Sequence, residues 1–297
     1  MILLQIKDTN QSQTTQAFIL KQLCDAPLLL VLFLLSFRQI LVQEPTPHFV
    51  MAIPTHLKNA PIQEAVIDIR AQISPEILKR KLQIIREEAA EAYSIVEEKK
   101  QVEHKLTVRD GQPQTSIKES FSGYFLTSKE KDKIAQFRVD GFTFSKLKPY
   151  TSWDQIIQDA IKGWQLYTRT LEPKLVSRIA ARYINRIILP LPIPDLNVYF
   201  TSLPTVPVSF PYTTNSFLFH SAIRHSDQNI HVNITQTSEP HQPSKTELSV
   251  IIDIDVFTNG DFPIESEDLL AFFEPIHQIK NSVFFSCITD ETVRHFQ

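Results

Sequence analysis

Apolar and polar residues follow two periods along this chain, one typical of strands and one typical of helices. Residues 65–71 alternate as a strand with one buried face does. Ser74 and Pro75 then predict the start of a helix, because serine caps helix N-termini and proline suits the first turn. The apolar positions that follow are three or four residues apart and form one stripe: Leu78, Leu82, Ile85, Ala89 and Ala92.

Three β-type runs come next, near residues 95–108, 115–127 and 133–146. The pairs Asp110-Gly111 and Asp140-Gly141 supply turn sequences typical of hairpins. We expect three antiparallel strands from these runs.

A second helix is predicted directly after the strands, opened by a capping box of Ser152 and Gln155. Its apolar face comprises Trp153, Ile157, Ala160, Trp164, Tyr167 and Leu171. Aromatic residues at helical spacing are more often core residues than a stacking platform for nucleic-acid bases. The predicted core therefore includes Trp153, Ile157, Trp164, Tyr183, Ile252, Ile254 and Phe284.

The second half of the chain begins with a predicted strand over residues 176–189. Six prolines between Pro190 and Pro211 predict a rigid connector with at most a short helix around residues 195–200. Three strands follow, near residues 217–225, 230–237 and 247–257. A last helix over residues 266–287 carries Leu269, Phe272, Phe273, Ile276, Phe284 and Cys287, and Pro275 is expected to kink it.

These elements predict an α+β fold in which two strand-helix-three-strand-helix halves form a largely antiparallel sheet with helices on one face. The expected divisions are a leader at 1–50, a first half at 51–173 and a second half at 174–297. The order of elements suggests an internal duplication and is analogous to that of the TATA-binding-protein class, an analogy of topology alone.

The candidate chemistry consists of charged residues at two-residue spacing on predicted strands, where alternate side chains share a face. They are Asp68, Arg70, Arg178, Arg182, Arg186, Asp253 and Asp255. One interpretation is cross-strand ion pairing on a sheet face, with Arg182 paired to Asp253 or Asp255. The alternatives are a concave site for an anionic or peptide-like ligand, or a metal site at the two aspartates.

The histidines and cysteines indicate no metal centre. His220, His225 and His231 are five and six residues apart, which does not match a zinc motif. His277 is expected to be a half-buried histidine with satisfied hydrogen bonds, and Cys287 a core residue.

Composition excludes several classes of protein. The 297 residues contain five glycines, too widely separated for a glycine-rich phosphate loop. The net charge of −3 and the lack of basic runs argue against a nucleic-acid partner. Two cysteines provide no disulfide framework, which fits a reducing cytoplasm. No cofactor is expected.

The first fifty residues differ from the rest. The apolar run at 26–37 is too short to cross a bilayer, and no signal-peptide cleavage pattern follows it. We expect that translation starts at Met51, which removes any membrane anchor, and that residues 1–50 do not contribute to the core. A membrane-proximal anchor is the alternative.

Two blocks of residues carry a family resemblance. The first is Phe142-Thr-Phe-Ser-Lys-Leu-Lys-Pro-Tyr150 with Trp153, and the second is Arg178-Ile-Ala-Ala-Arg182-Tyr-Ile-Asn185. They resemble the blocks shared by a family of uncharacterised proteins that is sporadically distributed in bacteria and archaea. The family brings no activity, but its distribution suits accessory proteins of defence or toxin–antitoxin-like systems.

Two functional hypotheses follow. The first is a non-enzymatic binding protein that recognises another protein or a small anionic ligand through the charged sheet face. The second is a metal-assisted enzyme acting on a phosphorylated or nucleic-acid substrate, with the arginines holding phosphate and Asp253 and Asp255 holding the metal.

Overall fold

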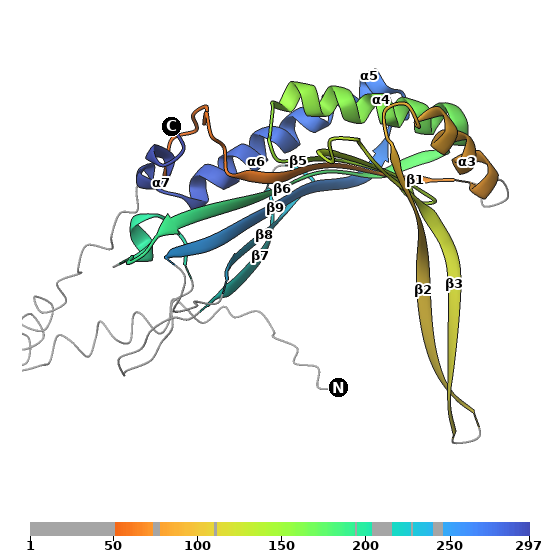
Figure 1. The fold of residues 1–297 in the computed structure, drawn as a ribbon, viewed down its shortest axis with the longest axis horizontal. Coiled ribbons are helices and arrows are strands. Elements are labelled where there is room, and N and C mark those ends of the chain that lie inside the picture. Colours follow the sequence, from red (N-terminus) through yellow and green to blue (C-terminus); the bar gives the residue numbers. More distant parts are fainter. Residues whose placement is uncertain are drawn as a thin grey trace, which may run out of the picture. The chain divides into compact units, whose positions relative to one another are not determined.

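Both halves of the chain contribute strands to one nine-stranded sheet (Figure 1). The computed structural model describes residues 51–73, 78–109, 112–193, 195–203, 216–226, 228–239 and 246–297, all within the unit Phe49–Gln297. The leader at 1–50 lies outside the described residues.

The strands of the first half are β1 (Ile62–Gln72), β2 (Ile95–Arg109), β3 (Gln112–Thr127), β4 (Lys133–Arg138) and β5 (Gly141–Leu147). Those of the second half are β6 (Leu175–Pro190), β7 (Leu218–Arg224), β8 (Ile230–Ser238) and β9 (Glu247–Phe262). Their order in the sheet is β2-β3-β4-β5-β1-β6-β9-β8-β7, and each neighbouring pair is antiparallel. The prediction of an α+β protein with a large antiparallel sheet is therefore confirmed.

Helices cover one face of this sheet (Figure 1). The helices are α3 (Leu78–Glu88), α4 (Trp153–Leu171), α5 (Ser266–Ala271), α6 (Phe273–Cys287) and α7 (Asp290–Arg294), with a 3-10 turn at Leu196–Val198. Helix α4 packs on β5 and β1, whereas α6 packs on β6 and β9. None of the helices in the described ranges is long and apolar enough to cross a membrane.

Strand alternation decides which side chains meet the helices. In β1, Ile67 and Ile69 are fully buried against the helices, and Asp68 and Arg70 point to the opposite face. In β6, Tyr183 and Ile187 are likewise buried on the helix side. Helix α4 begins where predicted, because the Ser152 hydroxyl accepts a hydrogen bond from the Gln155 backbone amide at 3.2 Å.

The β2–β3 hairpin extends beyond the rest of the sheet, away from the helices (Figure 1). Strand β3 pairs with β4 only over residues 123–127, so the outer part of the hairpin has no third strand within the described chain. A register shift at Lys99–Lys100 lies opposite Gly123, whose φ of 150° and contact with Phe137 leave no room for a side chain. This bulge marks the point where the hairpin leaves the sheet.

Two predicted elements are divided in the structure. The run near 133–146 is two strands, because Asp140-Gly141 forms a hairpin turn within it. The last helix is divided at Phe272 rather than kinked at Pro275. Pro275 lies in the first turn of α6, where its missing N–H costs no hydrogen bond.

Three side chains differ from the predicted core. The first helix ends at Glu88, so Ala92 falls in the following turn and is exposed. Phe272, at the break between α5 and α6, is 43% exposed. Trp153 is only half-buried because it lies in the first turn of α4, at the margin of the core. The other six residues of the predicted core are buried: Ile157, Trp164, Tyr183, Ile252, Ile254 and Phe284.

Candidate functional site

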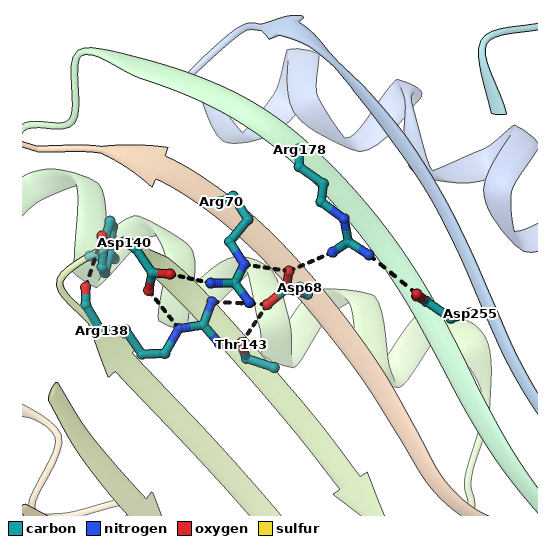
Figure 2. A network of polar contacts seen from close by, with 8 residues as sticks. Asp68, Arg70, Arg138, Asp140, Thr143, Arg178 and Asp255 are labelled. Atoms are coloured by element: carbon teal, nitrogen blue, oxygen red, sulfur yellow. Dashed lines mark hydrogen bonds and ion pairs between the residues drawn. The ribbon is translucent and has the colours of Figure 1, made fainter. Parts of the chain in front are cut away.

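The charged residues singled out in the sequence lie on the sheet face opposite the helices. Asp68 in β1 is at the centre of this group and is only 9% exposed (Figure 2). It accepts hydrogen bonds from Arg178 at 2.8 Å, Arg138 at 3.0 Å and Arg70 at 3.1 Å. Arg178 also reaches Asp255 at 3.3 Å and so links β1 to β9 across β6.

Three members of this network were not predicted: Arg138, Asp140 and Thr143. The Thr143 hydroxyl donates to Asp68 at 2.7 Å, and Asp140 receives hydrogen bonds from Arg70 and from Arg138. Arg138 alternates with the buried Phe137 in β4, so strand periodicity would have placed it on the charged face. The two-residue alternation does not, however, predict which strands lie side by side, so it could not show that Arg138 meets Asp68.

The other two predicted arginines each have their own acidic partner. Arg182 makes a two-pronged ion pair with Asp253, at 2.8 and 2.5 Å, which is one of the two partners expected. Arg186 pairs with Glu239 at 3.1 Å and donates to the Ser249 hydroxyl at 2.8 Å. The four-residue spacing of the arginines therefore distributes them over separate partners along β6.

The electrostatics of this face are internally balanced. Burial would raise the pKa of the Asp68 carboxyl, but Arg138, Thr143 and Arg70 outweigh it and hold that pKa below its usual value. Burial raises the pKa of Asp255 in spite of Arg178. In the central network three arginines meet three aspartates, so no charge remains uncompensated.

The aspartates are thus occupied by guanidinium groups. Within the described ranges no three His, Cys, Asp or Glu side chains gather as metal ligands would. Each of Asp253 and Asp255 instead holds an arginine. This arrangement can stabilise the sheet, and it offers no free charge to a ligand.

A cavity of about 880 Å³ lies elsewhere, beside α6. Its walls are residues 54–63 before and within β1, residues 148–153 before and at the start of α4, part of β6, and α6. Backbone hydrogen bonds hold the first of these walls: Asn59 donates to Phe296, Arg186 to Pro61, and Lys148 to Gln63. The cavity lies within the range of volumes that small organic ligands occupy.

The side chain of Lys280 in α6 is the unusual feature of this cavity, which we call the Lys280 cavity. Lys280 is 6% exposed, and its ammonium lies 3.8 Å from the centre of the Tyr183 ring. It donates one hydrogen bond to the Asn281 side chain at 2.5 Å. No carboxylate pairs with it among the described residues, and burial lowers its pKa to about 7.

A second buried lysine shows how a structural lysine is accommodated in the same chain. Lys146 in β5 is 4% exposed and pairs with Asp132 at 2.6 Å. A buried charge is expected to have such a partner, because an isolated one is costly. Lys280 departs from this rule at a cavity wall, where a ligand could supply the missing partner.

The neighbours of Lys280 are neutral and aromatic. The His277 ring stacks on Trp153 at 4.2 Å, and its Nε2 atom accepts a hydrogen bond from Asn281 at 3.1 Å. Burial lowers the pKa of His277 to about 4, helped by Lys280, so the ring is neutral at pH 7. The expectation of a half-buried, satisfied histidine is therefore confirmed.

The Tyr183 ring lies against the Lys280 ammonium, and the Tyr150 ring is 6.0 Å from the Tyr183 ring. Tyr150 and Asn185 both line the cavity, and the Asn185 amide donates to the Ile252 carbonyl at 3.1 Å. The lining therefore combines aromatic surface with a few polar groups, as ligand sites do.

Sequence reasoning missed Lys280, although a signal was present. The buried residues of α6 are Phe273, Ile276, Lys280, Phe284, Phe285 and Cys287. Lys280 therefore occupies a position of the apolar stripe, where a charged residue calls for an explanation.

The remaining candidates play smaller roles. Cys287 is buried, as expected, and burial raises its thiol pKa to about 11. His220 contacts the Thr235 hydroxyl, and His231 stacks on Phe257. These two histidines lie on the same face of the sheet, because His220 is opposite Thr235 in the register and Thr235 is four residues from His231 on the same strand.

Comparisons with family models and with curated proteins do not assign the chain to a family. No protein-family model matches the chain, and no curated protein matches it at a significant level.

Proposed function

We propose that this protein is a non-enzymatic binding protein and that its ligand is a small organic molecule held in the Lys280 cavity. The observation that supports this most strongly is the amino group of Lys280, which is buried at the cavity wall without an acidic partner. A ligand with a carboxylate or another negatively polarised oxygen would supply the missing partner.

The aromatic lining favours a ligand with a flat or apolar body. Trp153 is half-buried at the cavity, and Phe284 and Phe285 lie on the α6 side of it. Such surfaces bury the apolar part of a ligand, while the polar groups orient it. The charged sheet face, the first candidate from the sequence, is a weaker site because its ion pairs already neutralise it.

The alternative of a metal-assisted enzyme loses support for the same reason. Arginines that hold a phosphate need to be free to do so, whereas Arg178 and Arg182 are engaged with Asp68, Asp255 and Asp253. An accessory role in a defence or toxin–antitoxin-like system, in the cytoplasm, remains compatible with a ligand-binding protein.

We also propose that the fold is an internal duplication with the element order of the TATA-binding-protein class. Two central strands, β1 and β6, support it, since each pairs with the last strand of its own half, β5 or β9. Each half also ends with a helix that packs on the sheet: α4 follows the strands of the first half, and α6, after α5, follows those of the second.

Titration with benzoate, a small aromatic carboxylate, tests the binding proposal. The chain has two tryptophans, so Trp164→Phe leaves Trp153 at the cavity as the fluorescent reporter. We expect saturable quenching in this background, a loss of affinity of about tenfold or more with Lys280→Met, and no change with Lys162→Met. Lys162 is the matched control because its side chain is 74% exposed on α4.

Two results would contradict the proposal. One is equal benzoate affinity with and without Lys280. The other is the absence of any binding by benzoate, together with no small molecule retained by the purified protein in native mass spectrometry.

A further inference from the structure

We propose that Lys280 is a covalent carbonyl-capture site: its amino group forms a reversible imine with an aldehyde or ketone held in the Lys280 cavity. This inference rests on the proposed function and narrows the chemical class of the ligand. Lys280 lies on helix α6 and takes no part in the ion pairs of the charged sheet face.

The geometry first shows that the amino group is available. Of the two buried lysines compared above, Lys146 has its protons engaged by Asp132, whereas the Lys280 Nζ contacts a neutral amide and the face of a phenol ring. Nothing negatively charged among the described residues stabilises the ammonium form. Lys280 is one of the residues that line the cavity, so a ligand held there lies beside this side chain.

The protonation state agrees with this geometry. A lysine reacts with carbonyl groups only as the neutral amine, and desolvation in an apolar pocket is the usual way to obtain it. With a pKa of about 7, close to half of the Lys280 side chains are neutral at pH 7. An exposed lysine of ordinary pKa is neutral in roughly one molecule in several thousand at that pH.

The groups that face Lys280 are compatible with the reaction. Asn281, on its own helix, accepts a hydrogen bond from Nζ, and His277 is neutral. Tyr183, from β6, presents its ring face and carries a buried hydroxyl with a raised pKa, so it also stays neutral. None of these three groups carries a negative charge that would stabilise the ammonium form at neutral pH.

The chemical step balances without any further reagent. The Nζ lone pair attacks the carbonyl carbon, the C=O π bond opens, and a proton moves from nitrogen to oxygen through solvent to give a carbinolamine. The hydroxyl then takes up a proton from solvent and leaves as water while the nitrogen lone pair forms the C=N bond, and the resulting iminium ion returns its N–H proton to solvent. Amine and carbonyl become imine and water, and hydrolysis reverses the step.

The test uses benzaldehyde as the probe and sodium cyanoborohydride to reduce any imine to a stable secondary amine. The full-length protein is treated at pH 7, and peptide mass spectrometry follows the rate of modification at each lysine. We expect Lys280 to be modified about 10- to 100-fold faster than Lys162. This range is smaller than the ratio of their neutral-amine fractions, because the probe reaches the buried Lys280 less easily. Without the reductant, dialysis is expected to return the unmodified protein.

Comparison of lysines within one wild-type sample requires no variant to fold. Lys280→Arg adds a second criterion, since arginine keeps a positive charge but lacks a primary amine. We expect this variant to keep benzoate binding within about tenfold of wild type and to lose the modification at position 280. Its melting temperature serves as the check on folding.

The outcomes separate the two proposals. Modification of Lys280 no faster than that of Lys162 overturns carbonyl capture. If benzoate still binds in a Lys280-dependent manner, the site is then an anion site and the proposed function stands. If benzoate binding also fails, the proposed function falls with it.

Discussion

Replacement of Lys280 by methionine, a side chain of similar length without a charge, should stabilise the protein. The ammonium has lost its water without gaining an acidic partner, whereas methionine fills the same space without a charge. A gain in stability on mutation is typical of residues retained for function.

The size of the effect follows from the pKa of Lys280. The folded pKa of about 7 lies below the value of 10.5 for a free lysine, a difference that corresponds to about 5 kcal/mol at low pH. The folded pKa already includes the effects of the Tyr183 ring and of the hydrogen bond to Asn281. We therefore expect Lys280→Met to raise the free energy of unfolding by roughly 3–5 kcal/mol at pH 6.

The pH dependence is the sharper part of this prediction. Because the unfolded chain binds the Lys280 proton more tightly than the folded one, wild-type stability rises as pH increases between about 7 and 10.5. The methionine variant lacks this titration. Its advantage over wild type should therefore shrink by about 3 kcal/mol between pH 6 and pH 9.5.

Urea denaturation of wild type, Lys280→Met and the exposed control Lys162→Met at both pH values measures the effect. The control should differ from wild type by no more than about 0.5 kcal/mol at either pH. A Lys280→Met variant that is less stable than wild type at pH 6 would refute the reasoning. So would an advantage that is the same at both pH values.

Three further predictions concern the core and the charged face. Asp68→Asn should cost about 3 kcal/mol, because it removes the carboxylate shared by three arginines. Since folding lowers the pKa of Asp68, its carboxylate stabilises the protein above about pH 4, and this stabilisation should be lost as the pH falls through the folded pKa. An identical dependence of unfolding free energy on acidic pH in wild type and Asp68→Asn would contradict this. Arg182→Asp and Asp253→Arg should each cost about 1 kcal/mol at their partly exposed ion pair, and the double exchange should recover much of that loss in a double-mutant cycle. Trp164→Ala should lower the free energy of unfolding by about 3–5 kcal/mol, because this side chain is fully buried and its indole donates to the Ile264 carbonyl. Urea denaturation that shows almost no loss of stability would place Trp164 outside the core.

Much of the local structure was predictable because it depends on short-range periods. Alternation in β1 and β6 placed Asp68 and Arg178 on one face and Ile67 and Tyr183 on the other, since neighbouring strand residues must point in opposite directions. The helical stripe of α4 identified Trp164 as core for the same kind of reason. These inferences needed no knowledge of which strand lies beside which.

The order of the strands is a long-range property, and it determined the charged network. Asp68 meets both Arg138 and Arg178 only because β1 lies between β5 and β6, with β4 beyond β5. Residues 68 and 178 are 110 positions apart, so no local pattern connects them. The tertiary structure thus turned a set of candidate ligand-binding arginines into internally paired ones.

The Lys280 cavity shows the same division most clearly. The sequence by itself determined that Lys280 falls on the buried stripe of the last helix, between Ile276 and Phe284. Only the tertiary structure decided that this position faces a cavity and not an acidic partner, because the walls come from segments near residues 54–63, 148–153 and 185–188. Periodicity determines which way a side chain points, and packing between distant segments determines what it meets.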